Sequence, residues 1–304
     1  MSVVSSVDLG DTRVYVAAFS ADDTLLVLGT RCGKAQLVAV NGAAVRASIE
    51  HDGGIEGAAW RRGSADGSSL LATGGWDDMT VNVHQVMDEG RVVEERGALH
   101  ADMPVLAVRW SPDGRRLAVG SMDDVIIAAV SQEGKPGKTV SLHFDEGAWD
   151  VAWSPDGTMV AAAGDAGSVE VWHVADKRRV RSLRAGPRAW EVAFSPAGDL
   201  LAAVSKDGHV RLWDTTTWKM VKQWRRSGDV YSVAFSPDGR HLLTGGRDGV
   251  ASISSVATGK RVFELVGHEK DVYSATWSNS GTLVATASFD GTGRIWDVAD
   301  IVRE

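Results

Sequence analysis

Residues 230–239 read VYSVAFSPDG, and this stretch decides the fold. The residues alternate toward the aromatic Phe235, as in a half-buried β-strand. The segment SPDG then predicts a tight turn, because Pro presets φ and Gly accepts a positive φ. The unit continues with HLLTGG (241–246), a turn at 247–249, VASISSV (250–256), a turn at 258–259 and KRVFELV (260–266). This order predicts a four-stranded antiparallel meander.

The phrase that ends in this aromatic residue occurs seven times along the 304 residues. The aromatic residues are Phe19, Trp60, Trp110, Trp153, Phe194, Phe235 and Trp277, at steps of 41, 50, 43, 41, 41 and 42 residues. Repeats of this length are typical of propellers and solenoids. They favour one repeat domain over the two domains that chain length alone would suggest.

The repeats resemble those of the WD-repeat β-propeller family over essentially the whole chain. The residues that carry the resemblance are Gly267-His268, Asp290 and Trp296-Asp297 in the last unit, Asp207-Gly208 and Trp213-Asp214 in the fifth, and Trp172-His173 in the fourth. The resemblance implies an all-β fold, a single seven-bladed propeller of four-stranded antiparallel blades. We expect one domain over 1–304, with blades at approximately 10–50, 51–97, 98–142, 143–184, 185–225, 226–266, and 267–304 plus 2–9.

The last unit supplies only three strands, at 271–277, 282–288 and 292–298. A spare extended segment, SVVSSVDL at 2–9, precedes the first inner strand, which begins near Arg13. In the family, such an N-terminal strand completes the last blade and leaves no open edge. We therefore expect residues 2–9 to close blade seven.

Composition narrows the class of protein. The chain is 44% hydrophobic and 24% charged, with a net charge of −8 and a single cysteine, Cys32, which excludes an intramolecular disulfide. No apolar run approaches the roughly 20 residues that span a bilayer, and the first residues lack the pattern of a signal peptide. We expect a soluble cytoplasmic protein, with the nucleus as the alternative, that is not secreted, does not associate with membranes and acts as a monomer or as a subunit of a larger complex.

His268, Asp290 and Trp296, with a hydroxyl from Thr286 or Ser288, resemble the hydrogen-bond relay of a WD blade. Because the set follows the repeat register, we favour this structural role over a Ser-His-Asp catalytic triad. The same interpretation is given to His51, His100 and His143. The eight histidines lack zinc-ligand spacing, so we predict no metal site and no cofactor.

The relay is incomplete in several units. Its aspartate is kept at five positions: Asp77, Asp123, Asp207, Asp248 and Asp290. Cys32 and Ala166 replace it, and Cys32 is interpreted as a small buried substitute in preference to a redox sensor. Blades four to six have no histidine at the relay position, or an arginine near it: Arg184, Arg225 or Arg226. We expect packing rather than relays to hold these blades.

Basic residues cluster in KRRVRSLRAGPR (177–188) and at Lys219, Lys222, Arg225 and Arg226. Phosphate contacts require such a density of charge, so a nucleic-acid-associated subunit that uses this edge of blades four and five is one alternative function. The net charge of −8 and the need to protect exposed outer strands favour edge protection instead. An acidic protein partner is favoured over RNA or DNA.

The resemblance also implies a top surface, formed by three positions in each blade. The second residues of the inner strands are Tyr15, Glu56, Leu106, Trp149, Trp190, Tyr231 and Tyr273. The residues just before the turn aspartate are Arg31, Trp76, Met122, Asp165, Lys206, Arg247 and Phe289. The positions two residues before the first set include Arg13, Arg188, Asp229 and Asp271.

Seven of the 21 aromatic residues fall on these positions, and aromatics ringed by charges are typical of binding hot spots. We favour a binding role over mutual packing for Tyr15, Trp76, Trp149, Trp190, Tyr231, Tyr273, Phe289, Arg13, Arg31, Glu56, Arg188, Asp229, Arg247 and Asp271. Aromatic faces attract cations, so the ligand should carry Lys, methyl-lysine or Arg. The arginines would hold an acidic flank or a carboxylate.

The expected function is therefore a non-enzymatic scaffold that binds a peptide or protein segment at the mouth of the central channel. The alternative is a propeller hydrolase or lyase that uses channel carboxylates. Such an enzyme needs a convergent nucleophile, base or metal. The predicted lining offers Glu56, Asp165, Asp229 and Asp271 without a His, Cys or Ser beside them, so we predict no catalytic residue.

Overall fold

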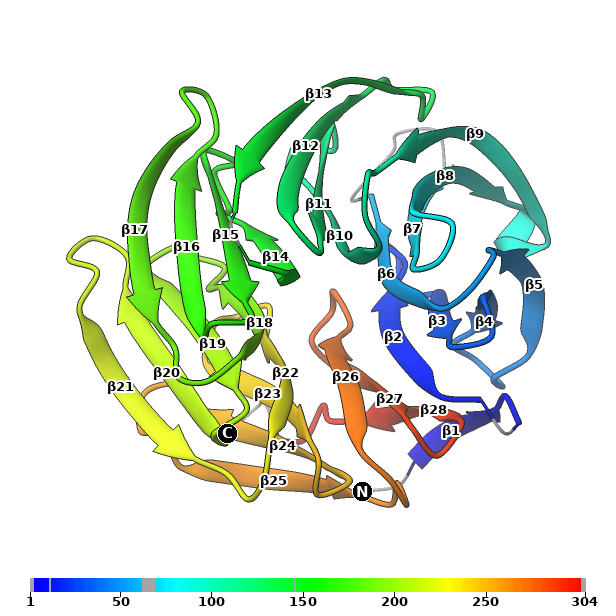
Figure 1. Cartoon of the computed structure of the whole chain (residues 1–304). Helices are drawn as coiled ribbons and strands as arrows, with labels where there is room; N and C mark the ends of the chain where they lie inside the picture. The colour runs from blue at the N-terminus through cyan, green and yellow to red at the C-terminus, as the bar shows by residue number, and fades with distance from the viewer. Residues whose placement is uncertain (1–2, 11, 62–68, 145, 302–304) are drawn as a thin grey trace.

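The computed structural model describes residues 3–10, 12–61, 69–144 and 146–301. These residues form seven four-stranded antiparallel sheets and one three-residue 3-10 turn, Asp88–Gly90. The sheets are arranged as blades around a central axis (Figure 1). The predicted seven-bladed β-propeller is thus confirmed.

The inner strand of every blade carries the repeated phrase and ends at its aromatic residue. The inner strands are β2 (Val14–Phe19), β6 (Ile55–Trp60), β10 (Val105–Trp110), β14 (Ala148–Trp153), β18 (Ala189–Phe194), β22 (Val230–Phe235) and β26 (Val272–Trp277). Each packs against the inner strand of the next blade, and β26 packs against β2. Phe235 is half-buried and the other six terminal aromatics are buried, so these rings form part of the core between blades.

The second strand of each blade lies within the blade and is almost wholly buried. The second strands are β3 (Leu25–Thr30), β7 (Ser69–Gly75), β11 (Arg116–Ser121), β15 (Met159–Gly164), β19 (Leu200–Ser205), β23 (His241–Gly246) and β27 (Leu283–Ser288). Sequences such as LLVLGT and MVAAAG suit this place because a strand covered on both faces needs apolar or small residues throughout.

The remaining strands complete each meander. The third strands are β4 (Lys34–Ala39), β8 (Thr80–Met87), β12 (Asp124–Val130), β16 (Ser168–His173), β20 (His209–Asp214), β24 (Val250–Ser255) and β28 (Thr292–Asp297). The outer strands are β5 (Val45–Glu50), β9 (Val92–His100), β13 (Pro136–His143), β17 (Arg178–Arg184), β21 (Met220–Arg225), β25 (Arg261–Val266) and β1 (Val3–Asp8).

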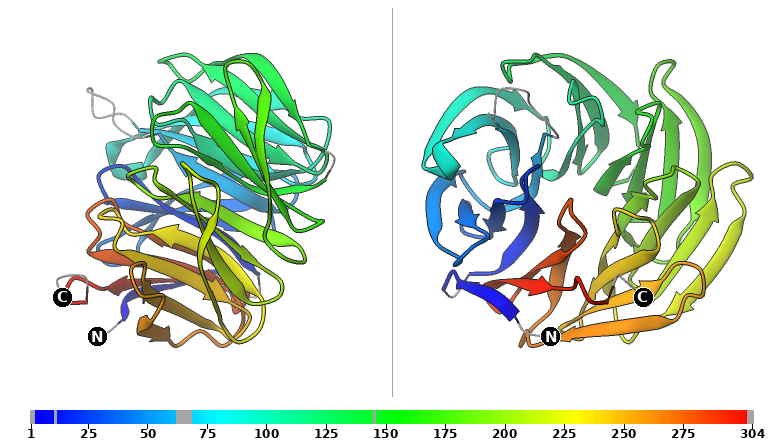
Figure 2. Two further views of the ribbon diagram at one scale, coloured as in Figure 1. Left: turned by 90° about the vertical axis from the view of Figure 1, so that its left-hand side faces the viewer. Right: turned by 180° about the vertical axis from the view of Figure 1, so that it is seen from behind.

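Blade seven is closed by the N-terminal strand, as predicted. β1 pairs antiparallel with β28, and the two strands lie side by side in the ring (Figure 2). Val7 is buried at 6% exposure in a cluster that contains Leu28 and Ile295, whereas Val4 is 52% exposed. The carboxylate of Asp23 in blade one adds a second link, because it accepts hydrogen bonds from the backbone N–H groups of Asn279 (2.7 Å) and Ser280 (2.8 Å).

One irregularity occurs at the same place in every blade. The pairing of each inner strand with the second strand shifts register between the first and third residues of the inner strand. The second residue is therefore an unpaired bulge residue. Such bulges twist a strand and redirect a side chain. The seven bulge residues are Tyr15, Glu56, Leu106, Trp149, Trp190, Tyr231 and Tyr273.

Blade seven contains a complete histidine relay. His268 Nδ1 lies 2.8 Å from Asp290 Oδ2, and His268 Nε2 lies 2.7 Å from the Thr286 hydroxyl. That hydroxyl also accepts a hydrogen bond from Trp296 Nε1 at 2.9 Å. Thr286, rather than Ser288, thus supplies the hydroxyl. Burial opposes ionisation of Asp290, but hydrogen bonds from Thr292 and His268 outweigh burial and hold the Asp290 pKa well below its usual range.

Blade two contains a second relay, with a different aspartate from the one predicted. His51 Nδ1 lies 2.8 Å from Asp78 Oδ2, and His51 Nε2 lies 2.8 Å from the Thr73 hydroxyl. The prediction of Asp77 was wrong because the turn between β7 and β8 is one residue longer than the corresponding turn in blade seven. Met79, at φ +52°, takes the left-handed position that Gly291 holds in blade seven.

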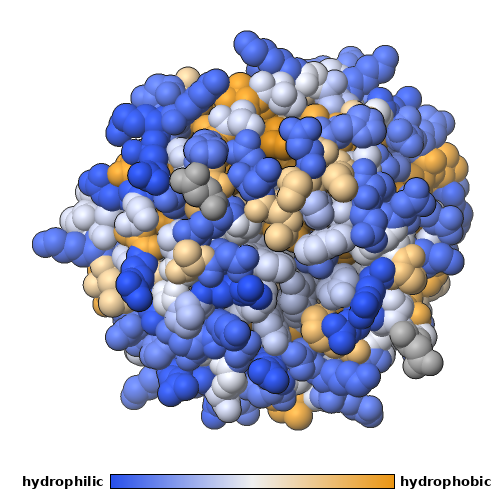
Figure 3. Space-filling view, viewed as in Figure 1, coloured by the Kyte–Doolittle hydropathy of each residue, from blue (hydrophilic) through white to orange (hydrophobic). Residues whose placement is uncertain are grey.

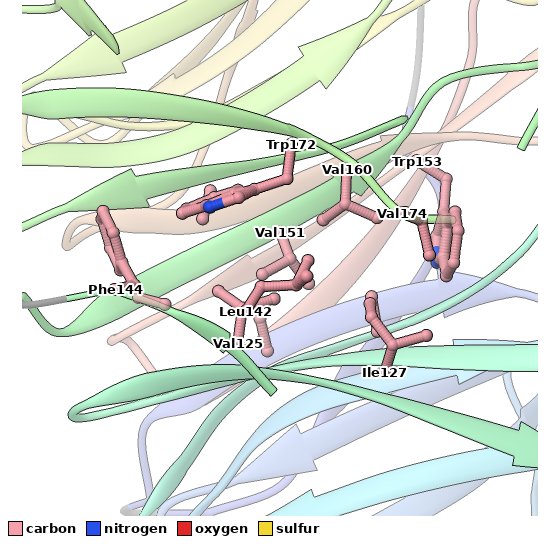
Figure 4. Close-up of a cluster of buried hydrophobic side chains, with 13 residues drawn as sticks. Val125, Ile127, Leu142, Phe144, Val151, Trp153, Val160, Trp172 and Val174 are labelled. Atoms are coloured by element: carbon pink, nitrogen blue, oxygen red, sulfur yellow. The ribbon is translucent and has the colours of Figure 1, made fainter. Parts of the chain in front are cut away.

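The relay interpretation was also wrong for His100 and His143, which are both exposed. In blade four, Phe144 follows His143 and is 1% exposed. Its ring meets Trp172 edge to face, at 5.6 Å between centroids (Figure 4). This cluster of blades three and four also includes Leu142 and Val151, so aromatic and aliphatic packing replaces the relay there.

Blades five and six are held by arginine relays, contrary to the expectation of packing alone. In blade six, the Arg226 guanidinium donates to the Thr244 hydroxyl (2.7 Å) and to Asp248 (3.1 Å). In blade five, Arg211 on β20 donates to the Ser205 hydroxyl (2.9 Å) and to Asp207 (2.7 Å). A guanidinium has enough donors to bridge the same hydroxyl and carboxylate that a histidine bridges.

Two further expectations fail. Cys32 is exposed rather than buried, with its Sγ atom 3.2 Å from the Thr30 hydroxyl. Arg226 does not belong to a basic outer edge, since only 9% of its side chain is exposed. Within the described ranges, no helix is both long enough and apolar enough to cross a bilayer.

Candidate functional site: the mouth of the central channel

The seven bulge residues meet at one place, the mouth of the channel. All of them line a cavity of about 50 Å³ at the centre of the ring. Leu106 is buried and the other six are half-buried. In the view of Figure 3, side chains fill the middle of the ring, and the surrounding surface is largely hydrophilic. The fold therefore brings seven residues from seven blades to a single small site.

Five of the bulge residues form a continuous arc of rings. Successive centroids lie 5.1 Å apart for Trp149 and Trp190, 5.5 Å for Trp190 and Tyr231, 5.4 Å for Tyr231 and Tyr273, and 5.4 Å for Tyr273 and Tyr15. Most of these contacts are edge to face, an arrangement that favourable ring electrostatics supports. We call these five residues the aromatic arc. Glu56 and Leu106 occupy the remaining two places in the ring of bulge residues.

Phe289 and Trp76, the two aromatic residues at the predicted positions just before the turn aspartate, differ in their ring contacts. Phe289 stacks on Tyr273 at 5.1 Å and lies 5.7 Å from Tyr15, so it joins the arc. Trp76 makes no ring contact with any residue that the structure describes, although its backbone holds the equivalent position in blade two. The reason is local, because the bulge residues of its own and the next blade are Glu56 and Leu106 rather than aromatics.

The charged residues around the aromatic arc fall into two groups. Three of them, Arg188, Arg13 and Asp271, contact neighbouring side chains. The Arg188 guanidinium lies over Trp149 and Trp190, at 5.1 and 5.0 Å, and its Nε is 2.5 Å from Asp165 Oδ1. Arg13 lies over Phe289 at 4.7 Å, and the Tyr231 hydroxyl donates to Asp271 at 3.0 Å.

Other predicted rim residues are free. The side chains of Arg31, Arg247 and Asp229 make no hydrogen bond or ion pair within the described residues, and both arginines are exposed. Their main chains are nonetheless fixed, since Arg31 N donates to Arg13 O and Arg247 N donates to Asp229 O. The mouth thus presents unpaired charges of both signs on a fixed backbone.

Arg188 has an unusual backbone conformation. Its φ is +38°, in a region that residues with a side chain rarely adopt. Such a conformation persists only where surrounding structure enforces it, and it occurs most often at functional sites. Here it holds the guanidinium above two rings of the arc.

Three charged residues that the sequence analysis did not select also line the cavity. Arg109 Nη2 lies 2.8 Å from Asp150 Oδ1 and 3.3 Å from Glu191 Oε1. Asp150 also accepts from Val192 N (3.2 Å), and Glu191 accepts from Val233 N (2.7 Å). The signal was present in the sequence, because the third residues of β14 and β18 are acidic within otherwise apolar inner strands.

Burial shifts the protonation of several of these groups. It raises the pKa of Glu56 to about 7. Burial, and then the nearby Asp150, raise the pKa of Glu191 to about 8. Burial likewise raises the pKa values of Tyr273 and Tyr231, with the hydrogen bond to Asp271 adding to the shift of Tyr231. The cavity therefore disfavours uncompensated negative charge.

The other candidate sites are weaker. Within residues 3–10, 12–61, 69–144 and 146–301, no group of three His, Cys, Asp or Glu side chains is arranged to hold a metal ion. The basic edge is divided, since Arg179 pairs with Glu170 at 2.8 Å and Lys222 donates to the carbonyl of Val256 at 2.9 Å. Arg188 belongs to the mouth and Arg226 to the interior of blade six.

The ring of four-stranded blades defines the fold as a β-propeller. Comparison with known protein families shows which propellers the chain is similar to. Residues 218–253 and 259–297 match the family described as "WD domain, G-beta repeat". Residues 78–207 match the family described as "Eukaryotic translation initiation factor eIF2A". The WD-repeat match and the seven-bladed ring together support a WD-repeat propeller family, whose members generally act as non-enzymatic scaffolds that bind other proteins.

A similar protein is the Periodic tryptophan protein 2 homolog of Schizosaccharomyces pombe. It is 48% identical to this chain over 44 residues, which are 14% of this chain. The match covers 5% of the length of that relative. The similarity therefore concerns about one repeat unit.

Proposed function

We propose that the chain is a non-enzymatic interaction scaffold that binds a peptide or protein segment across the mouth of its channel. The observation that carries this proposal is that the same bulge occurs in all seven blades. The bulge directs the second residue of every inner strand to one site. Five of those seven residues are aromatic. Aromatic side chains with little conformational freedom are frequent anchors of interfaces.

Mutual packing accounts for part of the arc but not for its surroundings. The rings contact each other, and a cavity of about 50 Å³ is too small to admit a peptide backbone. The segment would therefore lie across the mouth and insert single side chains. Arg31, Arg247 and Asp229 have no partner within the described residues, so they are available to its charged groups. Mixed charges favour a peptide with both basic and acidic residues over a nucleic acid.

An enzymatic role has less support. Asp150 and Glu191 are already engaged by Arg109 and by backbone N–H groups. Ser274 lines the cavity, but its hydroxyl accepts a hydrogen bond from Ala17 N (3.3 Å), and no general base among the described residues forms a hydrogen bond with it. The small cavity leaves little room for a substrate.

A role in translation is a second proposal, supported by one finding. Residues 78–207 match a family whose description names a translation initiation factor. The segment extends from blade two to blade five, so it includes both tryptophans of the arc. A scaffold of this kind would hold a protein of the translation apparatus. Ribosomal proteins or translation factors should then be present among its captured partners, and their absence would contradict this second proposal.

Affinity capture from the native cell tests the site. The variant Trp149→Ala with Trp190→Ala should lose the partners that the parent captures, because it removes two adjacent anchors. The matched control is Trp218→Ala with Trp224→Ala, which changes two half-buried tryptophans outside the mouth. This control variant should still capture the same partners as the parent. A folded mouth variant that keeps every partner would contradict the proposal.

A charge-reversal variant covers the case in which loss of two rings unfolds the chain. Arg31→Glu with Arg247→Glu alters exposed side chains that make no described contact, so the fold should be unaffected. The account predicts weaker capture of the same partners. Unchanged capture by this variant would mean that the rim residues Arg31 and Arg247 do not contribute to binding of the partner.

A further inference from the structure

We propose that the cavity inside the aromatic arc receives the primary ammonium group of a lysine side chain, with Glu56 as its counter-ion. This inference rests on the proposed function of the mouth and specifies which side chain the bound segment inserts. It narrows the three cations that the aromatic rim alone would accept, which are lysine, methyl-lysine and arginine.

The first argument is the isolation of Glu56. Its carboxyl group lines the cavity and is desolvated there, yet it makes no hydrogen bond or ion pair within the described part of the chain. The other two carboxylates of the cavity, Asp150 and Glu191, both contact Arg109 and both accept a backbone N–H. A buried carboxylate without a partner is costly, and a bound cation would remove that cost.

The second argument is the balance of charge around the cavity. Three carboxyl groups, those of Glu56, Asp150 and Glu191, face one guanidinium, that of Arg109. The walls are aromatic, since Tyr15, Tyr273, Trp149 and Trp190 line the same space. Ring faces and excess carboxylate both attract a cation. A bound cation would therefore favour the ionised form of Glu56, which Arg109 does not contact.

The third argument is the number of free acceptors. Glu56 is the carboxylate of the cavity that Arg109 does not contact, because Asp150 and Glu191 are already paired with that guanidinium. An ammonium group is a compact charge that one carboxylate can receive, whereas a guanidinium is a wide planar fork that needs several acceptors. A trimethylammonium group cannot donate a hydrogen bond to the carboxylate. A lysine ammonium therefore suits these acceptors best.

The charge of the site depends on pH. Burial holds the pKa of Glu56 at about 7, and the groups that face it are the neutral hydroxyls of Tyr15 and Tyr273 and the Arg109, Asp150 and Glu191 cluster. A lysine ammonium stays protonated to about pH 10. As pH rises through 7, Glu56 ionises more readily and the ammonium should bind more tightly.

The test uses three small cations as probes at equal ionic strength: n-butylammonium, n-butylguanidinium and tetramethylammonium. The readout is the NMR signals of the Trp149 and Trp190 indole N–H groups, which are assigned by single Trp→Phe variants. We expect saturable shifts with n-butylammonium at lower concentration than with the other two. Binding should tighten between about pH 6 and about pH 8 in the parent protein.

Glu56→Gln should weaken n-butylammonium binding by at least about tenfold and abolish its pH dependence. The matched control is Glu95→Gln, an exposed position on β9 of the same blade, which should change nothing. The inference is overturned if n-butylammonium gives no saturable shift, if the guanidinium or tetramethylammonium binds more tightly, or if Glu56→Gln has no effect.

The outcome separates this inference from the proposed function. If the double tryptophan variant loses its captured partners while n-butylammonium binds independently of Glu56, the mouth remains a binding site and only the lysine pocket is wrong. If neither variant affects capture or cation binding, both proposals fail.

Discussion

At the scale of single residues, Glu56 is the exception in the mouth. The other six bulge residues are aromatic or aliphatic, and the second residue of β6 alone carries an ionisable acid. Its burial raises its pKa to about 7 from a usual value of 4.5. The folded protein must therefore spend part of the physiological pH range with a disfavoured charge at its centre.

Stability should accordingly fall as pH rises through this interval. The folded-state pKa of Glu56 lies above the unfolded-state value, so the stability linked to the protonated form is complete below about pH 4.5 and is lost as pH passes 7. Glu56→Gln removes this loss. We expect the melting temperature of the variant to match that of the parent near pH 4.5 and to exceed it near pH 8.

Thermal unfolding followed by circular dichroism across this pH range checks the prediction. Glu95→Gln on the outer strand of the same blade serves as the control and should follow the parent at every pH. Parallel curves for Glu56→Gln and the parent would mean that Glu56 is not the perturbed group.

At the scale of elements, four blades satisfy an equivalent hydroxyl and carboxylate with one of two kinds of donor, a histidine or an arginine. His268 does so in blade seven and His51 in blade two, whereas Arg226 and Arg211 do so in blades six and five. Arg211 comes from the third strand rather than from the loop that precedes the blade. The structural requirement is thus the satisfaction of buried polar groups, not the identity of the donor.

Arg226→Ala should destabilise the protein by at least about 3 kcal/mol, because it leaves Asp248 and the Thr244 hydroxyl without their buried donor. Its neighbour Arg225 is exposed on β21 and makes no described side-chain contact, so Arg225→Ala should cost less than about 0.5 kcal/mol. Midpoints of urea unfolding give both values. Equal midpoints for the two variants would refute the arginine relay.

Strand positions could be predicted from the sequence because turn residues such as Pro237 and Gly239 separate the segments that form strands. The bulges could not, because an unpaired residue such as Trp149 adds no turn chemistry to the sequence. The relay of blade two was misassigned for a similar reason, since one extra turn residue before Thr80 changes which aspartate faces His51. Arg226 was noticed, but only the fold shows that its side chain turns inward.

The candidate site was partly predictable. The family positions select all seven bulge residues of the mouth, and Phe289 joins the arc. The ion cluster of Arg109, Asp150 and Glu191 was missed because contacts between different blades depend on the closed ring. Trp76 was included because its position matches the family pattern, although the bulge residues of its own and the next blade, Glu56 and Leu106, are not aromatic.

At the scale of the whole molecule, the ring is closed by β1 and by the link from Asp23 to Asn279 and Ser280. Without β1, the edge of β28 would be unpaired and the cluster around Ile295 would lose Val7. Deletion of residues 1–9 should therefore cause aggregation or a large fall in melting temperature. A deletion variant that melts like the parent would refute this role.

A matched pair of point variants refines the closure prediction. Val7→Ala should cost about 1 to 3 kcal/mol, since Val7 is 6% exposed, whereas Val4→Ala should be nearly neutral because Val4 is 52% exposed. Urea unfolding of the two variants measures the difference.

The central claim is that the mouth of the channel, rather than the outer edge, contacts the partner. Site-specific photo-crosslinking in the native cell tests it most directly, with p-benzoylphenylalanine in place of Tyr15 at the mouth and, in a second protein, in place of Val221, which is 53% exposed on the outer strand β21. The account predicts that illumination crosslinks a partner protein from position 15 and not from position 221. Crosslinks from position 221 alone would contradict it.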